Sequence, residues 1–209
     1  RLQVLRMYRG GHLRENPGPH YWQQDPQNNH RWHRNAGLTL AALALAEGDE
    51  SDDLLADVLN ELQFVADWLP EDGTSHEGPS YMVFGGAHLV LAFDAADRCL
   101  GTNFLDHPFF KETIDFRLHT LTPGLNEVFC FGDCGGKGSY NNYLFACTVH
   151  HGLEGRQSGV MEFYRKNPES FWIGWFSLIW WRPTGQTDLV RDLPLTRFFP
   201  DLGLAFMRD

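Results

Sequence analysis

Two polar clusters in this sequence carry side chains that can move protons, and each stands where an apolar, helix-periodic run begins. The first cluster contains Asn29 and His30, and the second contains Glu77 and Tyr81. An imidazole can take or give a proton near neutral pH, a phenol can protonate a leaving oxygen, and an amide can donate hydrogen bonds. The sequence therefore predicts acid–base chemistry if the fold brings the two clusters together.

The helices predicted around these clusters place both of them at one edge of a helical layer. Apolar residues at steps of three and four predict helices over about residues 32–48, 51–70 and 79–100. Short connections make consecutive helices antiparallel, so the first and third helices point the same way and start on the same face. His30 is then expected just before the first helix and Tyr81 in the first turn of the third.

Further helical runs continue the pattern along the chain. They are predicted over residues 108–121, 143–151, 156–166 and 169–181, and the last is so apolar that we expect it to be buried on most sides. If alternate helices are parallel, their starts converge on one rim. We therefore expect an all-α chain for most of its length, arranged as an incomplete ring of antiparallel helical hairpins. An open helical solenoid is the alternative, although no repeat of fixed period supports it.

The hydrophobic pattern of the last residues changes from helical periodicity to alternation, which predicts a second domain. Residues 196–209 show short alternation around glycine, which is typical of a strand. We therefore expect a helical domain over residues 1–195 and the beginning of a β domain over residues 196–209. The chain starts without Met or an apolar leader, so we expect a fragment of a longer protein that carries no signal sequence itself.

Composition and charge limit the class of protein. With 209 residues, of which 43% are hydrophobic, the chain is long enough to bury a substantial core. No run of about 18 or more apolar residues predicts a membrane span. The formal net charge of -10 argues against nucleic-acid binding, because phosphates attract a basic surface. The cysteines lack paired CxxC spacing, so no disulfide framework is expected, although a local bridge between Cys130 and Cys134 stays open.

Several short motifs resemble those of one enzyme family. They are the Asn29-His30 pair, the Asp72-Gly73 turn followed by Glu77 and Tyr81, the Phe131-Gly132-Asp133 loop and the segment 199–204. Together they resemble the heparinase II/III-like polysaccharide lyases, which include alginate lyases and relatives of dermatan-sulfate epimerase, over roughly residues 25–209. The resemblance implies an incomplete (α/α) toroid followed by an antiparallel β-sandwich that this chain barely enters.

The resemblance also implies a location and a partner. It implies a secreted or periplasmic protein whose substrate is an acidic polysaccharide or oligosaccharide. Together with the charge, it leads us to expect no nucleic-acid partner and no membrane insertion. No cofactor is implied for the helical part, and a structural metal is an option only in the β domain. The oligomeric state stays open.

The resemblance implies catalytic roles for His30 and Tyr81. In this family an Asn or His beside the first helix engages the uronate carboxylate, and a Tyr one hairpin later handles protons. β-Elimination removes the weakly acidic C5 proton, so the enzyme must neutralise the carboxylate and stabilise an enolate-like intermediate. Either His30 is the base and Tyr81 the acid, or Tyr81 plays both roles while Asn29 and His30 hold the carboxylate. The second assignment needs a cation such as Arg31 near the phenol, which is ordinarily protonated at neutral pH.

Substrate-binding roles are expected for residues on or beside the same rim. Cationic and polar side chains can bind an anionic sugar, and aromatic rings can stack on its faces. The expected substrate-binding residues are Asn29, Arg31, Trp32, His33, Glu77, Asp133 and Tyr140, and the same predicted rim includes Lys137, Asn141 and Trp172. Structural roles are the simpler alternative, such as Glu77 as a first-turn acid that complements a helix dipole and Asp133 as a turn residue.

Other functions stay open on the sequence alone. A uronyl C5-epimerase would use the same scaffold but would return the proton to C5 without cleaving the chain. A glycoside hydrolase built on a helical ring would use Glu77 and Asp133 as acid and base, and a glycan-binding protein would need no catalysis. A metal site drawn from His30, His33, His76 and Glu77 has no supporting motif.

Overall fold

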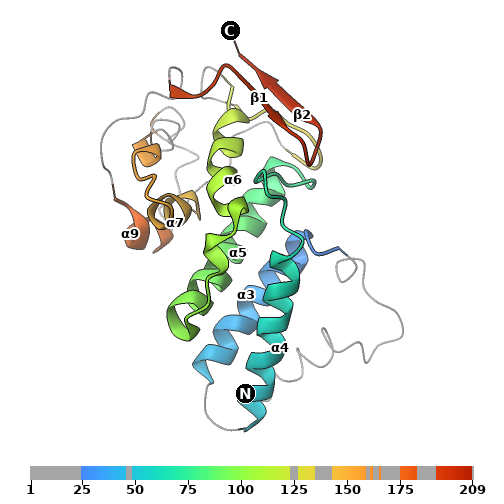
Figure 1. Cartoon of the computed structure of the whole chain (residues 1–209), viewed down its shortest axis with the longest axis vertical. Coiled ribbons are helices and arrows are strands. Elements are labelled where there is room, and N and C mark those ends of the chain that lie inside the picture. Colours follow the sequence, from blue (N-terminus) through green and yellow to red (C-terminus); the bar gives the residue numbers. More distant parts are fainter. Residues whose placement is uncertain are drawn as a thin grey trace.

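Helices dominate the architecture. The computed structural model describes residues 25–45, 49–122, 127–134, 143–158, 161, 165, 175–182 and 192–208. Most of these residues are helical, and they contain one two-stranded sheet (Figure 1). The elements are α3 (Asn29–Ala44), α4 (Asp49–Ala66), α5 (Pro79–Leu100), the 3-10 helix η1 (Phe104–Asp106), α6 (Pro108–His119), α7 (Tyr143–His150), α9 (Trp175–Trp180), β1 (Thr196–Phe199) and β2 (Leu204–Met207). The prediction of a mostly helical chain is confirmed.

The four long helices run alternately down and up along the long axis of the molecule. Figure 1 shows α3 descending, α4 ascending, α5 descending and α6 ascending. Helix α3 packs against both α4 and α5. Helices α3 and α5 therefore point the same way and begin at the same end of the bundle, as the short connections predicted. This common end is where the two polar clusters lie.

The first helix begins earlier than predicted. Asn28 caps α3, because its side-chain oxygen accepts a hydrogen bond from the His30 backbone N–H at 3.0 Å. His30 therefore lies inside the first turn rather than just before the helix. Helix α3 also ends at Ala44 and α4 begins at Asp49, a few residues from the predicted limits. Helix α5 starts at the predicted Pro79, where a missing backbone N–H is tolerated.

An aromatic core joins α3, α5 and α6. Phe93 on α5 and Phe109 and Phe110 on α6 have no exposed surface. The ring of Phe110 lies edge-on to both others, with its centroid 5.4 Å from that of Phe93 and 5.2 Å from that of Phe109. Trp32 on α3 meets Phe109 at 6.2 Å between centroids. Pairs of this kind add about 0.5–1.5 kcal/mol each beyond the free energy of burial.

A glycine sets the closest approach between α3 and α5. A Cβ atom at Gly85 would lie 2.7 Å from Cε3 of Trp32 and 3.1 Å from Cβ of Asn29. Any side chain at this position would push the two helices apart. The absence of a side chain at Gly85 therefore brings the start of α3 close to the first turns of α5.

The C-terminal hairpin packs on α6. Strands β1 and β2 pair antiparallel. Phe199 of β1 meets Phe116 of α6 edge-on at 5.1 Å between ring centroids, and Arg197 forms ion pairs with Glu112 and Asp115. The alternating residues near the C-terminal end therefore form β structure as predicted. The β-sandwich domain stays a prediction.

The apolar helix α9 is less buried than predicted. Trp180 is buried, but Leu178 is 77% exposed and Ile179 is 44% exposed. The expectation of burial on most sides is wrong for Leu178 and Ile179, although α9 packs against α7. Gln157 holds the end of the helix, since its Nε2 donates to the Trp180 carbonyl at 2.9 Å. The start of this predicted helix and most of the predicted helix over 156–166 lie outside the described residues.

Two further expectations can be compared with the described residues. Within these ranges, no helix combines the length and the apolar composition that a membrane crossing requires. All four cysteines fall in the same ranges, and no disulfide joins any two of them. The bridge between Cys130 and Cys134 that their spacing left open is therefore not formed.

The glycine at the helix crossing provides a test of the packing. We expect Gly85→Ala to lower the free energy of unfolding by about 1–3 kcal/mol, because the new methyl group overlaps Trp32. Gly37→Ala is the matched control on α3, since no atom lies within 4 Å of the added Cβ. Alanine there should raise the free energy of unfolding by about 0.5–1 kcal/mol through helix propensity. Urea denaturation measures both, and equal effects would contradict the described crossing.

One buried histidine and three half-buried ones predict a loss of stability on acidification. Burial is the main cause that lowers four histidine pKa values from the ordinary 6.5, at His33, His107, His119 and His151. As pH falls through about 6.5, the unfolded chain takes up protons that the folded chain does not, so the free energy of unfolding falls. Urea midpoints at about pH 7.5 and about pH 5.5 measure this loss. His119→Asn should flatten part of the slope, and a midpoint that rises on acidification would contradict the prediction.

Candidate functional site

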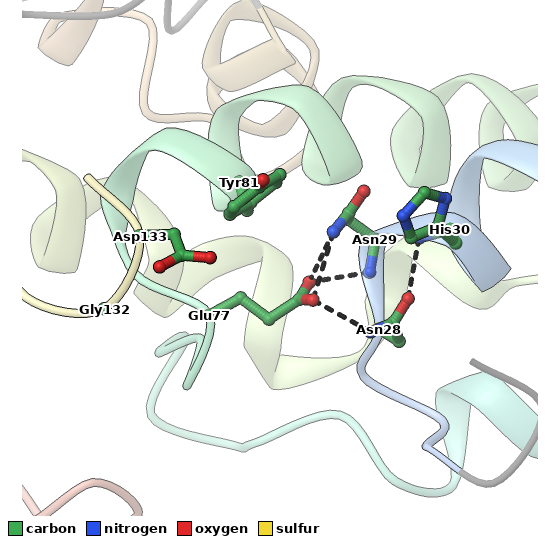
Figure 2. Close-up of a pocket in the computed structure, with 7 residues that line it drawn as sticks. All are labelled: Asn28, Asn29, His30, Glu77, Tyr81, Gly132 and Asp133. Atoms are coloured by element: carbon green, nitrogen blue, oxygen red, sulfur yellow. Dashed lines mark hydrogen bonds between the residues drawn. The ribbon is translucent and has the colours of Figure 1, made fainter. Parts of the chain in front are cut away.

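One pocket opens at the common end of α3 and α5. Its volume is about 350 Å³, within the range of about 300–1,000 Å³ found for small-molecule sites. The residues that line it are Asn28, Asn29, His30, Glu77, Tyr81, Gly132 and Asp133 (Figure 2). The structure thus brings together His30, Tyr81, Asn29, Glu77 and Asp133, all of which the sequence singled out.

The carboxylate of Glu77 organises the wall formed by α3. It accepts hydrogen bonds from the Asn29 backbone N–H at 2.6 Å and from the Asn28 side-chain amide at 2.9 Å. The Asn29 side-chain nitrogen reaches both oxygens of the same carboxylate, at 3.0 and 3.1 Å. Backbone N–H groups at a helix start lack partners within the helix and favour a negative charge. Glu77 therefore complements the dipole of α3; it precedes α5 and is not the first-turn acid that the sequence suggested.

The Asn29 amide keeps one N–H group for another acceptor. The two oxygens of a carboxylate lie too close together for each to take a separate N–H from one amide nitrogen, so a single N–H serves both. The second N–H of this amide is therefore not used by Glu77. A bound anion can accept it while the Asn29 side chain stays in place.

Two glycines let the loop that carries Asp133 touch the segment before α5. A Cβ at Gly78 would lie 2.2 Å from the Phe131 carbonyl oxygen, and a Cβ at Gly132 would lie 2.8 Å from the Glu77 carbonyl oxygen. Both glycines also have positive φ angles, +88° and +62°. Backbone therefore packs directly on backbone here, which places Asp133 at the pocket.

His30 and Tyr81 enter the pocket from different helices. Figure 2 shows Tyr81 and Asp133 on one side of Asn29 and His30 on the other. Tyr81 is 38% exposed, and its hydroxyl makes no hydrogen bond with the described residues, so it can bind a ligand without losing an internal partner. His30 is half-buried, since it lies on the first turn of α3 beside the pocket.

Arg31 and Trp32 do not line the pocket, contrary to the substrate-binding roles predicted for them. Arg31 is only 6% exposed; it pairs with Glu61 of α4 at 2.7 Å and lies over the ring of Phe64 at 4.6 Å. Trp32 is 1% exposed and donates its indole N–H to the Pro26 carbonyl at 2.9 Å. Because α3 begins at Asn29, successive residues point in different directions around the helix.

His33 lies beside the pocket but is not part of its lining. Its ring centroid is 5.9 Å from that of His30 and 5.7 Å from that of His88 on α5. Burial lowers the pKa of His33 most, and the nearby His88, Arg34 and His30 lower it further. His33 is therefore held neutral more strongly than an ordinary histidine, and its predicted substrate contact is not in the pocket itself.

Some predicted site residues cannot be placed, and two lining residues were not predicted. Tyr140, Lys137, Asn141 and Trp172 lie outside the described residues. Asn28 and Gly132 line the pocket without having been named as site residues. Asparagine before a helix is a strong capping signal, which could have identified Asn28. Gly132 carries no such signal, because its role depends on a distant backbone segment.

The metal site considered from the sequence is not assembled. Among the described residues, no group of three or more His, Cys, Asp or Glu side chains is placed to hold a metal ion. His76 pairs instead with Asp25 at 3.0 Å. The Glu77 carboxylate accepts hydrogen bonds from Asn28 and Asn29. The histidines whose spacing suggested this site therefore make other contacts.

Comparisons with known proteins do not assign the chain to a family. No protein-family model matches the sequence, and no curated protein matches it either. The site is therefore interpreted from its own residues. These offer an imidazole and a phenol for proton transfer, an amide N–H for an anion, and a carboxylate at Asp133.

The Glu77 contact predicts a specific loss of stability. We expect Glu77→Gln to lower the free energy of unfolding by about 1–3 kcal/mol, because the amide NH2 then faces the N–H donors of Asn28 and Asn29. Glu71→Gln is the matched control, since it removes the same charge from an exposed position of the same loop. Urea denaturation compares the two variants. Equal midpoints for both would contradict the structural role of Glu77.

Proposed function

We propose that this chain forms part of the active site of a polysaccharide lyase that cleaves a uronate-containing acidic polysaccharide by β-elimination. The observation that carries the proposal is the common pocket of His30, Tyr81 and Asn29. The motif resemblance to the heparinase II/III-like lyases points to the same three residues. An (α/α) toroid, a following β-sandwich and a secreted or periplasmic location belong to this proposal.

The chemistry of β-elimination requires the kinds of groups that the pocket contains. The C5 proton of a uronate is weakly acidic, so the adjacent carboxylate must first be stabilised by hydrogen-bond donors. The second N–H of the Asn29 amide can serve as one such donor. A base then removes the C5 proton, and an acid protonates the oxygen that leaves C4.

The position of Arg31 favours one of the two catalytic assignments. Tyr81 can act as the base only if a nearby cation stabilises its ionised form, and Arg31 was the expected cation. Its guanidinium pairs with Glu61 on the side of α3 that faces α4. We therefore assign His30 as the base and Tyr81 as the acid for the leaving oxygen, with Asn29 at the carboxylate.

The carboxylates of the pocket support a lyase better than a glycoside hydrolase. A hydrolase needs one carboxylic acid and one carboxylate on either side of the scissile bond. Glu77 instead accepts hydrogen bonds from Asn28 and Asn29 through both of its oxygens. Its role is to hold the start of α3. An epimerase would share the C5 deprotonation step, so product analysis has to separate it from a lyase.

The activity can be tested on a panel of uronate polymers. The longest natural form of the protein is incubated with heparan, chondroitin and alginate, and the ultraviolet absorbance of an unsaturated uronate is followed. We expect a signal with at least one polymer and a fall of about 100-fold or more in His30→Ala and in Tyr81→Phe. His150→Ala is the control, because this histidine pairs with Asp106 away from the pocket.

The same assay separates the competing outcomes. Incorporation of solvent deuterium at C5 without chain cleavage would identify an epimerase. Shortened chains without the unsaturated product would identify a hydrolase. A folded protein that gives neither signal on the whole panel would contradict the proposed function.

A further inference from the structure

A row of aromatic rings continues from the pocket along the surface where α3 and α5 meet. It consists of His30 and His33 on α3 and Phe84 and His88 on α5, and we call these four residues the ring row. His33 is the centre of the row, with its centroid 5.9 Å from His30, 5.6 Å from Phe84 and 5.7 Å from His88. Phe84 and His88 are 4.7 Å apart. The rings therefore form one continuous surface that begins at the pocket.

The ring row is accessible and is joined to the pocket at two points. Phe84 is 46% exposed, so a face of its ring is open to a ligand. His30 belongs both to the row and to the pocket lining. Tyr81, which also lines the pocket, precedes Phe84 by three residues on α5, so the two side chains lie on neighbouring turns of one helix face.

The hydrogen bonding of His88 defines what the row can offer to a ligand. Its Nδ1 lies 2.8 Å from the Phe84 carbonyl oxygen. A carbonyl can only accept, so Nδ1 carries the proton and Nε2 is left to face another partner. A neutral His88 can accept a hydrogen bond from a sugar hydroxyl through Nε2, and a protonated His88 can donate one to a carboxylate.

The charges around the row suit an anionic ligand. The groups that act electrostatically on His33 are His88, Arg34 and His30, all of which are basic. This local excess of basic groups stands out in a chain whose formal net charge is -10. Arg34 carries a positive charge and each imidazole can donate a hydrogen bond, so the carboxylates of an acidic polymer find suitable partners at this surface.

We propose that the ring row is a second sugar subsite, which binds the uronate residue next to the one held in the pocket. Phe84 packs against the C–H face of that sugar, and His33 and His88 contact its hydroxyl and carboxylate groups. The identity of the ligand rests on the proposed function. The existence of the subsite rests on the ring contacts and on their continuity with the pocket.

A length series of oligouronides tests the subsite. Calorimetric titration uses the Tyr81→Phe background to prevent turnover, with monosaccharides and disaccharides of mannuronate and of glucuronate as the ligands. We expect the disaccharide to bind more tightly than the monosaccharide, and Phe84→Ala to weaken the disaccharide about tenfold while leaving the monosaccharide unchanged. His88→Ala should act in the same direction and serves if Phe84→Ala does not fold.

The controls separate this inference from the proposed function. Phe198→Ala removes a phenylalanine that is 61% exposed on β1 and should change neither affinity. Equal disaccharide and monosaccharide affinities, or a disaccharide affinity unchanged by Phe84→Ala, would overturn the subsite and leave the lyase proposal intact. Length-dependent binding through Phe84, with no unsaturated product and no C5 exchange in the unsubstituted protein, would overturn the lyase and keep the subsite. The absence of any oligouronide binding would overturn both.

Discussion

The carboxylate of Glu77 at the start of α3 is the contact on which the rest of the site depends. It joins the segment before α5 to residues 48 positions earlier in the chain. The backbone N–H groups at the start of a helix have no partners within it. A carboxylate there accepts hydrogen bonds from these groups and also interacts favourably with the positive end of the helix dipole. Because His30 follows Asn29 and Tyr81 lies one turn beyond Glu77, this contact also determines how the imidazole and the phenol face the same pocket.

Close backbone approaches complete the framework of the site. Gly85 lets α3 lie against α5, and Gly78 and Gly132 let the loop of Asp133 rest on the segment that carries Glu77. In each case an added Cβ would lie closer to a neighbouring atom than van der Waals contact allows. The walls of the pocket are therefore made partly of backbone, whose position is set by packing and does not depend on side-chain rotamers.

The distribution of charge around the pocket suits the acidic polymer that we propose as the substrate of this acidic chain. Glu77 is turned toward α3, so its negative charge is offset by N–H donors before a substrate arrives. Basic side chains gather beside the pocket at His30, His33 and Arg34. Under the proposed function, an anionic sugar meets hydrogen-bond donors and imidazoles at this end of the bundle, which is the environment that C5 deprotonation requires.

The sequence by itself determined the helices and the common edge of the two clusters, because apolar periodicity and Pro79 are local signals. Those signals suffice to predict that α3 and α5 start together and that β structure follows residue 195. Only the tertiary structure decided which side chains of the first cluster face the pocket. The sequence placed Arg31 and Trp32 at the rim as residues around the helix start, but Asn28 starts the helix earlier and helical rotation turns them toward α4 and the core. Glu77, the partner of Asn28 and Asn29, lies 48 positions or more along the chain, and a contact between residues so far apart in sequence produces no local sequence pattern.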